Sequence, residues 1–227
     1  MKKYLVIGNP INHSLSPRLH NHWIKQNGID AVYEKKELND NELENLISNV
    51  KKGTIKGVNV TVPFKNAIIP YLDELSNDAK KTQAVNTIYL RDKKIFGHNT
   101  DIHGFENAIK KINFNFKNKK ILILGAGGVV PSIICASIKM ESSEIIVSNR
   151  TKEKAERVKK LFNNIKLIDW GKVPNFDVII NATSLGLKPE DKINLDFTKI
   201  GKNKLFYDVI YNPRETYFLK MGKKLGN

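Results

Sequence analysis

The fold class of this 227-residue chain is set by the stretch Lys120-Ile121-Leu122-Ile123-Leu124-Gly125-Ala126-Gly127-Gly128. Its aliphatic residues predict a buried strand, and the glycines predict a tight turn into a helix expected from Val129 to Lys139. A second strand is expected from Glu144 to Ser148. This order of elements within about thirty residues indicates a dinucleotide-binding unit, in which the pyrophosphate lies on the glycines and the positive end of the helix.

One position departs from the usual glycine pattern. Val130 occupies the third glycine position of GxGxxG and is followed by Pro131, which the first turn of a helix tolerates. We therefore expect slightly looser packing between this helix and its strand.

The end of the second strand indicates which dinucleotide is bound. An NAD site offers an Asp or Glu there to the ribose 2′-hydroxyl. Here the chain reads Ser148-Asn149-Arg150-Thr151, and Lys154 is expected one helical turn after Arg150 on the same face. Since a guanidinium pairs well with a phosphate, these residues favour NADP over NAD.

A second informative stretch lies upstream at Asn59-Val60-Thr61-Val62-Pro63-Phe64-Lys65. Its valines predict a strand from Gly57 to Val62 that Pro63 ends, with Lys65 opening the next segment. One lysine among 38 Lys and Arg residues is ordinarily a surface charge. Lys65 stands out because residues 8–17, 84–87 and 99–101 are also polar turns at the ends of apolar runs, and open α/β folds keep their chemistry at such strand ends.

Apolar strands alternate with amphipathic segments over the first ninety or so residues, which predicts a largely parallel α/β sheet. We expect strands near residues 4–7, 32–36, 57–62 and 87–90, helices near 17–27 and 41–49, and a hairpin partner at 95–97. Downstream, residues 176–184 predict a buried strand that lines the nicotinamide side of the dinucleotide cleft, and residues 206–213 repeat the pattern of strand and turn.

The composition predicts a globular cytoplasmic protein. Hydrophobic residues make up 41% of the chain, and its single cysteine excludes an internal disulfide. The apolar run after Met1 is too short for a signal peptide, and no run approaches the roughly 20 apolar residues that span a bilayer. The net charge of +15 raises the question of nucleic acid, but the lysines are spread along the chain, so we expect anionic small molecules instead. A metal site at His13, His20 and His22 is disfavoured because no cysteine or carboxylate cluster joins them.

Together these segments resemble the shikimate dehydrogenases, NADP-dependent enzymes of aromatic amino-acid biosynthesis, from Gly8 to about Leu219. The resemblance implies an N-terminal α/β substrate domain, residues 1–101, joined by helical linkers to an NADP-binding Rossmann domain, residues 102–227. It also implies reversible NADPH-dependent reduction of 3-dehydroshikimate to shikimate.

The resemblance further implies roles for individual residues. The catalytic pair is Lys65 and Asp101, and no metal is required. Substrate contacts are implied for Ser14, Ser16, Thr61, Lys65, Asn86, Asp101 and Tyr211, with the serines holding the carboxylate. Cofactor contacts are implied for Gly125, Ala126, Gly127, Gly128, Asn149, Arg150, Thr151, Lys154, Thr183 and Ser184.

The residues leave other functions open besides shikimate dehydrogenase. A quinate or broad quinate/shikimate dehydrogenase would discriminate its substrate at Ser14 and Ser16, and two small hydroxyls there suit shikimate. A methylene-tetrahydrofolate dehydrogenase would lack the Ser-x-Ser motif, and Lys65 with Asp101 argues against a nucleotide- or nucleic-acid-binding protein without catalysis.

The resemblance also implies a final helix with a substrate-binding glutamine, beyond the last residue of this sequence. We therefore expect a shortened form with NADP binding largely retained and weak shikimate turnover. A monomer or homodimer is expected.

Overall fold

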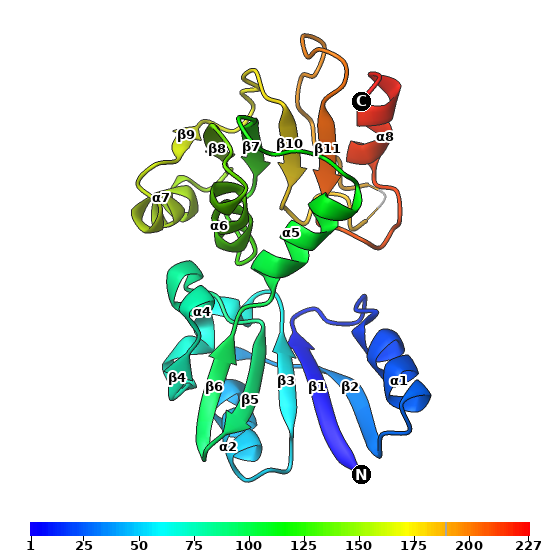
Figure 1. Cartoon of the computed structure of the whole chain (residues 1–227), viewed down its shortest axis with the longest axis vertical. Coiled ribbons are helices and arrows are strands. Elements are labelled where there is room, and N and C mark those ends of the chain that lie inside the picture. Colours follow the sequence, from blue (N-terminus) through cyan, green and yellow to red (C-terminus); the bar gives the residue numbers. More distant parts are fainter. Residues whose placement is uncertain (189) are drawn as a thin grey trace. The chain divides into compact units, whose positions relative to one another are not determined.

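Two α/β units, Met1–Ile102 and His103–Asn227, make up the chain (Figure 1). The computed structural model describes residues 1–188 and 190–227. None of the helices in these two ranges has the length and apolar character needed to cross a bilayer.

The first unit is built on a six-stranded mixed sheet with the strand order β2-β1-β3-β5-β6-β4. Its strands are β1 (Lys2–Gly8), β2 (Ala31–Glu37), β3 (Gly57–Val60), β4 (Glu74–Leu75), β5 (Thr87–Arg91) and β6 (Lys94–His98). Strands β1, β2 and β3 run parallel, as expected, and β5 and β6 form the predicted hairpin. The prediction of a largely parallel sheet holds for three of the five strand pairs, since β4 also runs parallel to β6, but β5 runs antiparallel to both of its neighbours.

The third strand ends earlier than its valine pattern predicts. The backbone N–H of Thr61 still donates to the carbonyl of Ile7 at 2.9 Å, but the carbonyl of Thr61 already accepts from the N–H of Phe64 at 2.9 Å. The chain therefore turns at Thr61, and Val62, expected in the strand, lies 60% exposed in that turn.

Four helices and two 3-10 turns complete the first unit: α1 (Ser16–Gln26), Asp40–Glu42, α2 (Leu43–Lys51), α3 (Phe64–Ala67), Ile69–Tyr71 and α4 (Asn77–Thr82). The helix predicted at 41–49 begins two residues later than expected. Asn39 and Glu42 form a capping box, in which the backbone N–H of Asn39 donates to Glu42 Oε2 at 2.8 Å. The Glu42 N–H donates to the Asn39 carbonyl three residues earlier at 3.0 Å, so the first turn is a 3-10 turn.

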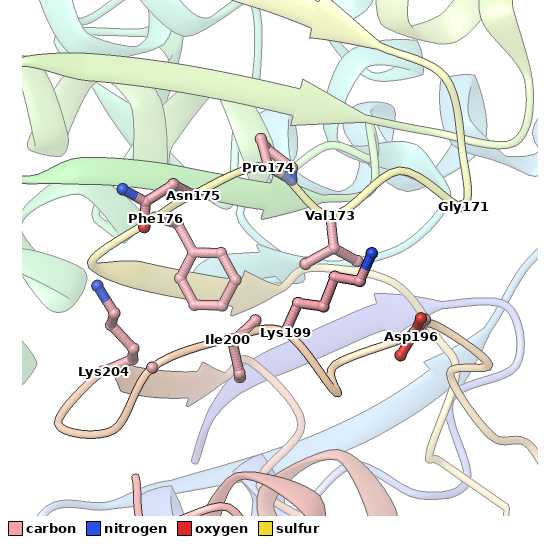
Figure 2. Close-up of a pocket in the computed structure, with 10 residues that line it drawn as sticks. Gly171, Val173, Pro174, Asn175, Phe176, Asp196, Lys199, Ile200 and Lys204 are labelled. Carbon is pink, nitrogen blue, oxygen red and sulfur yellow. The ribbon is translucent and has the colours of Figure 1, made fainter.

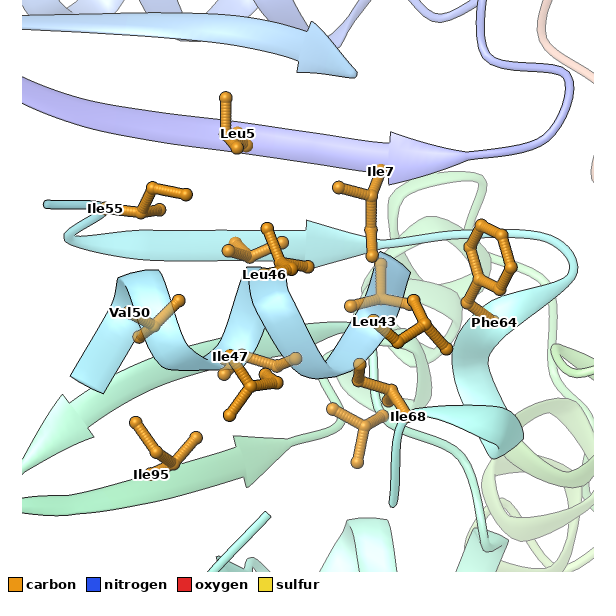
Figure 3. Close-up of a cluster of buried hydrophobic side chains, with 14 of the residues drawn as sticks. Leu5, Ile7, Leu43, Leu46, Ile47, Val50, Ile55, Phe64, Ile68 and Ile95 are labelled. Atoms are coloured by element: carbon orange, nitrogen blue, oxygen red, sulfur yellow. The ribbon is translucent and has the colours of Figure 1, made fainter. Parts of the chain in front are cut away.

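The core of the first unit lies between α2 and the sheet (Figure 3). Leu43, Leu46, Ile47 and Val50 recur at the spacing of one helical face, and all four are buried. They pack with strand residues such as Ile7, and with Phe64 and Ile68 from the segment after β3. This packing anchors the short helix α3, which carries Lys65.

The second unit contains a five-stranded parallel sheet with the order β11-β10-β7-β8-β9. The strands are β7 (Lys120–Leu124), β8 (Glu144–Ser148), β9 (Lys166–Ile168), β10 (Val178–Asn181) and β11 (Leu205–Asp208). The helices are α5 (Asp101–Lys111), which begins in the first unit, α6 (Val130–Lys139), α7 (Lys152–Leu161) and α8 (Tyr217–Lys224). The two strands and the helix predicted around the glycine turn are confirmed within one residue, whereas β10 is shorter than the predicted 176–184.

Helix α1 is attached to strand β2 by side-chain contacts rather than by fully buried residues. The ring of His20 stacks on the ring of Tyr33, with centroids 4.2 Å apart and planes at 4°. The Asn21 side chain accepts from the Tyr33 N–H at 2.9 Å and donates to its carbonyl at 2.8 Å. Burial lowers the pKa of His20 below its ordinary value, because the stacked imidazole loses hydration.

The lowered pKa of His20 predicts a pH dependence of stability. The unfolded chain takes up a proton at His20 more readily than the folded chain, so stability is lost as the pH falls below about 6.5. His20→Phe keeps a flat ring against Tyr33 and removes the titration. The unfolding free energy, measured with urea, should therefore fall less between about pH 7.5 and about pH 5.5 in His20→Phe than in the wild type. An equal or larger fall in the variant would contradict this account.

Candidate active site

One edge of the first sheet collects the polar turns that the sequence singles out. The carboxyl ends of β1, β3 and β6 lie at this edge together with the amino end of β5 (Figure 1). The register pairs Ile7 with Val60 and pairs Thr87 with both Asn59 and His98. The segments 8–17, 61–65 and 99–101 leave or enter the sheet here, as does Asn86, although they lie far apart in the sequence.

Lys65 and Asp101 form a partly buried ion pair at this edge. Lys65 Nζ donates to Asp101 Oδ2 at 2.6 Å. Lys65 is 9% exposed, because α3 is held down by Phe64, which is 1% exposed. An ammonium placed in this way can deliver both a proton and a positive charge to a reacting oxygen.

Asn86 joins the pair. Its Nδ2 donates to Asp101 Oδ1 at 2.7 Å, while its Oδ1 accepts from the Thr100 backbone N–H at 3.0 Å. Because a backbone N–H only donates and a carboxylate only accepts, these two partners determine which way the amide points. The structure therefore brings together Lys65, Asn86 and Asp101 from three separate segments.

Thr61, Ser14 and Ser16 belong to the same edge. A Cβ added to Gly8 would lie 2.7 Å from Thr61 Cγ2, so the loop after β1 runs directly against the turn after β3. The Asn9 N–H donates to the Val62 carbonyl at 3.0 Å and joins the two segments. Ser14 Oγ accepts from the Ser16 N–H at 3.3 Å, and both serines are half-buried at the start of α1.

In the second unit the glycine turn follows β7. Gly125 has a φ of +115°, and an added Cβ would lie 2.7 Å from the carbonyl oxygen of Ala182. Its N–H donates to the Ser148 carbonyl at 2.8 Å. From the sequence, we expect a glycine here because it leaves room for a ligand. In the structure, Gly125 also leaves room for the backbone after β10. At Gly127 an added Cβ would lie in open space, so the contact with a ligand stays a prediction for that residue.

The residues expected to read a 2′-phosphate follow β8. Arg150 and Lys154 are exposed. The expectation that they share a helical face is wrong, because α7 begins only at Lys152 and Arg150 precedes it. Sequence reasoning also missed Asp169, which follows β9 and lies 3.6 Å from Lys152 and 3.3 Å from Lys172. The hydrogen bond from Lys172, with help from Lys152, lowers the pKa of Asp169. The position of Asp169 directly after an apolar run is the sequence feature that could have identified it.

Asn181 organises the turn after β10. It is fully buried, and its Oδ1 accepts from the Thr183 N–H at 3.0 Å and from Thr183 Oγ1 at 2.7 Å. Its Nδ2 donates to Asp208 Oδ1 at 3.1 Å. Burial raises the pKa of Asp208 despite this bond and those from Thr216 and Ile210. Asp208 is a further residue that sequence reasoning missed, and its place at the end of β11 was the signal.

The remaining residues predicted for the second unit lie near the surface. Ser184 is exposed and Tyr211 is 59% exposed, while Ala126 and Gly128 are half-buried in the glycine turn. Asn149 Nδ2 donates to the Thr151 carbonyl at 2.8 Å, which shapes the turn before α7.

A cavity of about 450 Å³ lies elsewhere in the second unit (Figure 2). Val173, Phe176 and Ile200 supply apolar lining, and Lys199 and Lys204 supply cationic lining. Asn175 and Phe176 precede β10 and Lys204 precedes β11, so the cavity lies at the amino ends of these strands. None of the residues predicted for substrate or cofactor lines it.

The glycine turn on a parallel sheet and the lysine–aspartate pair on a separate sheet define a class, the α/β dinucleotide-dependent dehydrogenases. Residues 6–88 match the family model described as the shikimate dehydrogenase substrate binding domain, and residues 106–215 match that described as shikimate/quinate 5-dehydrogenase. The chain belongs to the shikimate dehydrogenase family.

Individual relatives agree with this assignment. A protein of Pelagibacter ubique named shikimate dehydrogenase (NADP(+)) is 60% identical over 99% of this chain and 85% of its own length. The crystal structure of shikimate dehydrogenase from Aquifex aeolicus has a TM-score of 0.89 at 39% identity and covers all of this chain and 84% of its own. The Thermus thermophilus enzyme, solved with NADP(H) and shikimate, has a TM-score of 0.89 at 31% identity and covers 100% and 85%. The predicted family, fold class and class of enzyme are confirmed.

Gly125→Ala tests the turn that these glycines form. The added methyl would lie against the Ala182 carbonyl in a backbone conformation that L-residues rarely adopt, which costs roughly 1–3 kcal/mol. We expect a melting temperature several degrees lower in Gly125→Ala. Gly127→Ala is the matched control, because its methyl meets open space. Equal melting temperatures for the two variants, measured by circular dichroism, would contradict this role of Gly125.

Proposed function

We propose that this chain catalyses the reversible NADPH-dependent reduction of 3-dehydroshikimate to shikimate. The observation that carries the proposal is the ion pair of Lys65 with Asp101 at 2.6 Å, held at a sheet edge beside Asn86. The 60% identity to a relative named shikimate dehydrogenase (NADP(+)) supports both the substrate and the cofactor. We assign residues 1–101 to substrate binding and catalysis and residues 102–227 to NADP.

The second unit fits the cofactor. The open space at Gly127 gives a pyrophosphate access to the turn before α6, and the exposed Arg150 and Lys154 suit the 2′-phosphate. Gly125, Ala126 and Gly128 complete the turn, and Asn149 with Thr151 shapes the loop at Arg150. Thr183 and Ser184 follow β10, at the carboxyl edge where a dinucleotide binds in such sheets. Bound NADPH supplies a hydride to the carbonyl carbon of the substrate.

The first unit supplies the proton and orients the substrate. In reduction, Lys65 donates a proton to the ketone oxygen while Asp101 holds its ammonium in place. In oxidation, Lys65 takes the proton back. We assign Thr61, in the turn before α3, and Asn86, which donates to Asp101, to the ring hydroxyls, and Ser14 and Ser16 to the carboxylate. We also assign Tyr211, which follows β11, to the substrate.

The substrate is a single small molecule, and we propose that the enzyme acts as a monomer or homodimer in the cytoplasm. The single cysteine suits a reducing compartment. Sedimentation at micromolar concentration distinguishes the two assemblies.

Lys65→Ala tests the proton donor. Removal of a general acid typically costs roughly 10²-fold or more, so kcat for shikimate formation should fall by about that factor with a smaller change in KM. Lys51→Ala, at an exposed lysine in the last turn of α2, is the control and should keep wild-type turnover. Turnover of Lys65→Ala within a fewfold of the wild type would contradict the assignment.

Arg150→Ala tests how the cofactor is selected. A hydrogen bond to a charged group contributes about 1.5–3 kcal/mol, so NADPH affinity should fall about 10- to 150-fold while NADH affinity stays nearly unchanged. Titration calorimetry with both cofactors measures this difference. Arg157→Ala, exposed further along α7, should leave both affinities near the wild type. Equal losses for both cofactors in Arg150→Ala would mean that Arg150 does not read the 2′-phosphate.

A further inference from the structure

A continuous chain of side-chain hydrogen bonds leads from strand β2 to the ion pair. The Tyr33 hydroxyl donates to Asn59 Oδ1 at 2.6 Å, and Asn59 Nδ2 donates to Thr87 Oγ1 at 3.2 Å. Thr87 Oγ1 donates to Asn86 Oδ1 at 3.0 Å, and Asn86 Nδ2 donates to Asp101 Oδ1 at 2.7 Å. Tyr33 is thus connected to Asp101 across β2, β3 and the start of β5.

The hydrogen bonds of this network all run in the same direction, with each donor on the Tyr33 side and each acceptor on the Asp101 side. The Thr87 hydroxyl has one proton, so when it donates to Asn86 it must accept from Asn59. Asn59 Nδ2 also donates to the Asn86 carbonyl at 3.2 Å, which leaves Asn59 Oδ1 for the Tyr33 hydroxyl. The orientation of each group in the network is therefore tied to those of both its neighbours, as in a cooperative network.

Tyr33 is itself firmly held. It is 5% exposed, stacked under His20 and paired with the Asn21 side chain, both from α1. Burial raises the pKa of Tyr33, so its hydroxyl keeps the proton that it donates. Helix α1 begins at Ser16, so Tyr33 also connects the helix of the serine pair to this network.

We propose that Tyr33, acting through Asn59 and Thr87, is a positioning residue for the reaction. By donating to Asn86 Oδ1, the network adds to the hold of Thr100 on the Asn86 amide, which directs Nδ2 to Asp101 and so keeps the Asp101 carboxylate in line with Lys65. Thr100 also holds Asn86, because its backbone N–H donates to Asn86 Oδ1 at 3.0 Å and its Oγ1 accepts from Asn86 Nδ2 at 2.8 Å, so loss of Tyr33 should weaken this positioning without abolishing it. This inference rests on the proposed roles of Lys65, Asn86 and Asp101.

Kinetics of hydroxyl-deletion variants test the proposal. Tyr33→Phe and Thr87→Val each remove one hydroxyl, and each should lower kcat for shikimate oxidation about 3- to 10-fold with KM for NADP unchanged. The double variant should lose little more than the larger single effect, because both act through one network. Thr87→Ser restores the hydroxyl and should regain most of the activity.

A matched control separates this effect from general damage to the sheet. Tyr89→Phe removes a hydroxyl from β5, where the ring packs on Phe96, and should keep wild-type kcat. Melting temperatures of all variants identify any that fail to fold. A wild-type kcat in Tyr33→Phe, or strictly additive losses in the double variant, would overturn the proposal.

A readout without turnover separates the network from the proposed function. In NMR spectra of the full chain, the side-chain amide signals of Asn86 should shift or broaden in Tyr33→Phe and stay in place in Tyr89→Phe. If they move while wild-type protein fails to oxidise shikimate with NADP, the network stands and the proposed function fails. Unmoved Asn86 signals in Tyr33→Phe would overturn the network whatever the activity.

Discussion

The candidate active site depends on one interaction, the ion pair between Lys65 and Asp101. Removing an ammonium from water is costly unless a counter-charge and good hydrogen-bond geometry replace the lost hydration. Lys65 is 9% exposed, and its Nζ lies 2.6 Å from a carboxylate oxygen that is held on its other side by Asn86. The apolar packing of Phe64 and Ile68 places the lysine there, so the geometry of the site depends on the packing of the core.

The mixed sheet of the first unit explains how distant segments reach this pair. If β5 ran parallel to β3, its carboxyl end would lie at the site edge and Asn86 would be carried to the opposite edge. Because β5 runs antiparallel, its amino end lies beside the carboxyl ends of β3 and β6, and Asn86 comes within 2.7 Å of Asp101. The departure from a parallel sheet is therefore what assembles the site.

In the second unit, the backbone segments that follow the parallel strands approach one another closely. The turn at Gly125 leaves no room for a Cβ beside the Ala182 carbonyl after β10, and Asn181 and Asp208 connect the turns after β10 and β11 by a hydrogen bond of 3.1 Å. These are buried polar groups that satisfy one another. Such a frame leaves Gly127 and the cations of Arg150 and Lys154 open toward an anionic ligand.

The sequence by itself determined the class of each unit, the glycine turn, the cationic residues after β8 and the polar residues that mark strand ends, because these follow from local periodicity and turn chemistry. It also singled out Lys65 as a candidate, because its place after a valine strand and a proline is a local pattern. Only the tertiary structure decided that β5 reverses direction, that Arg150 lies outside α7, and that Tyr33, Asn59 and Thr87 connect to Asn86. Those features depend on which strands become neighbours and in which register, and contacts between residues 26 or more positions apart leave no periodic signal in the chain.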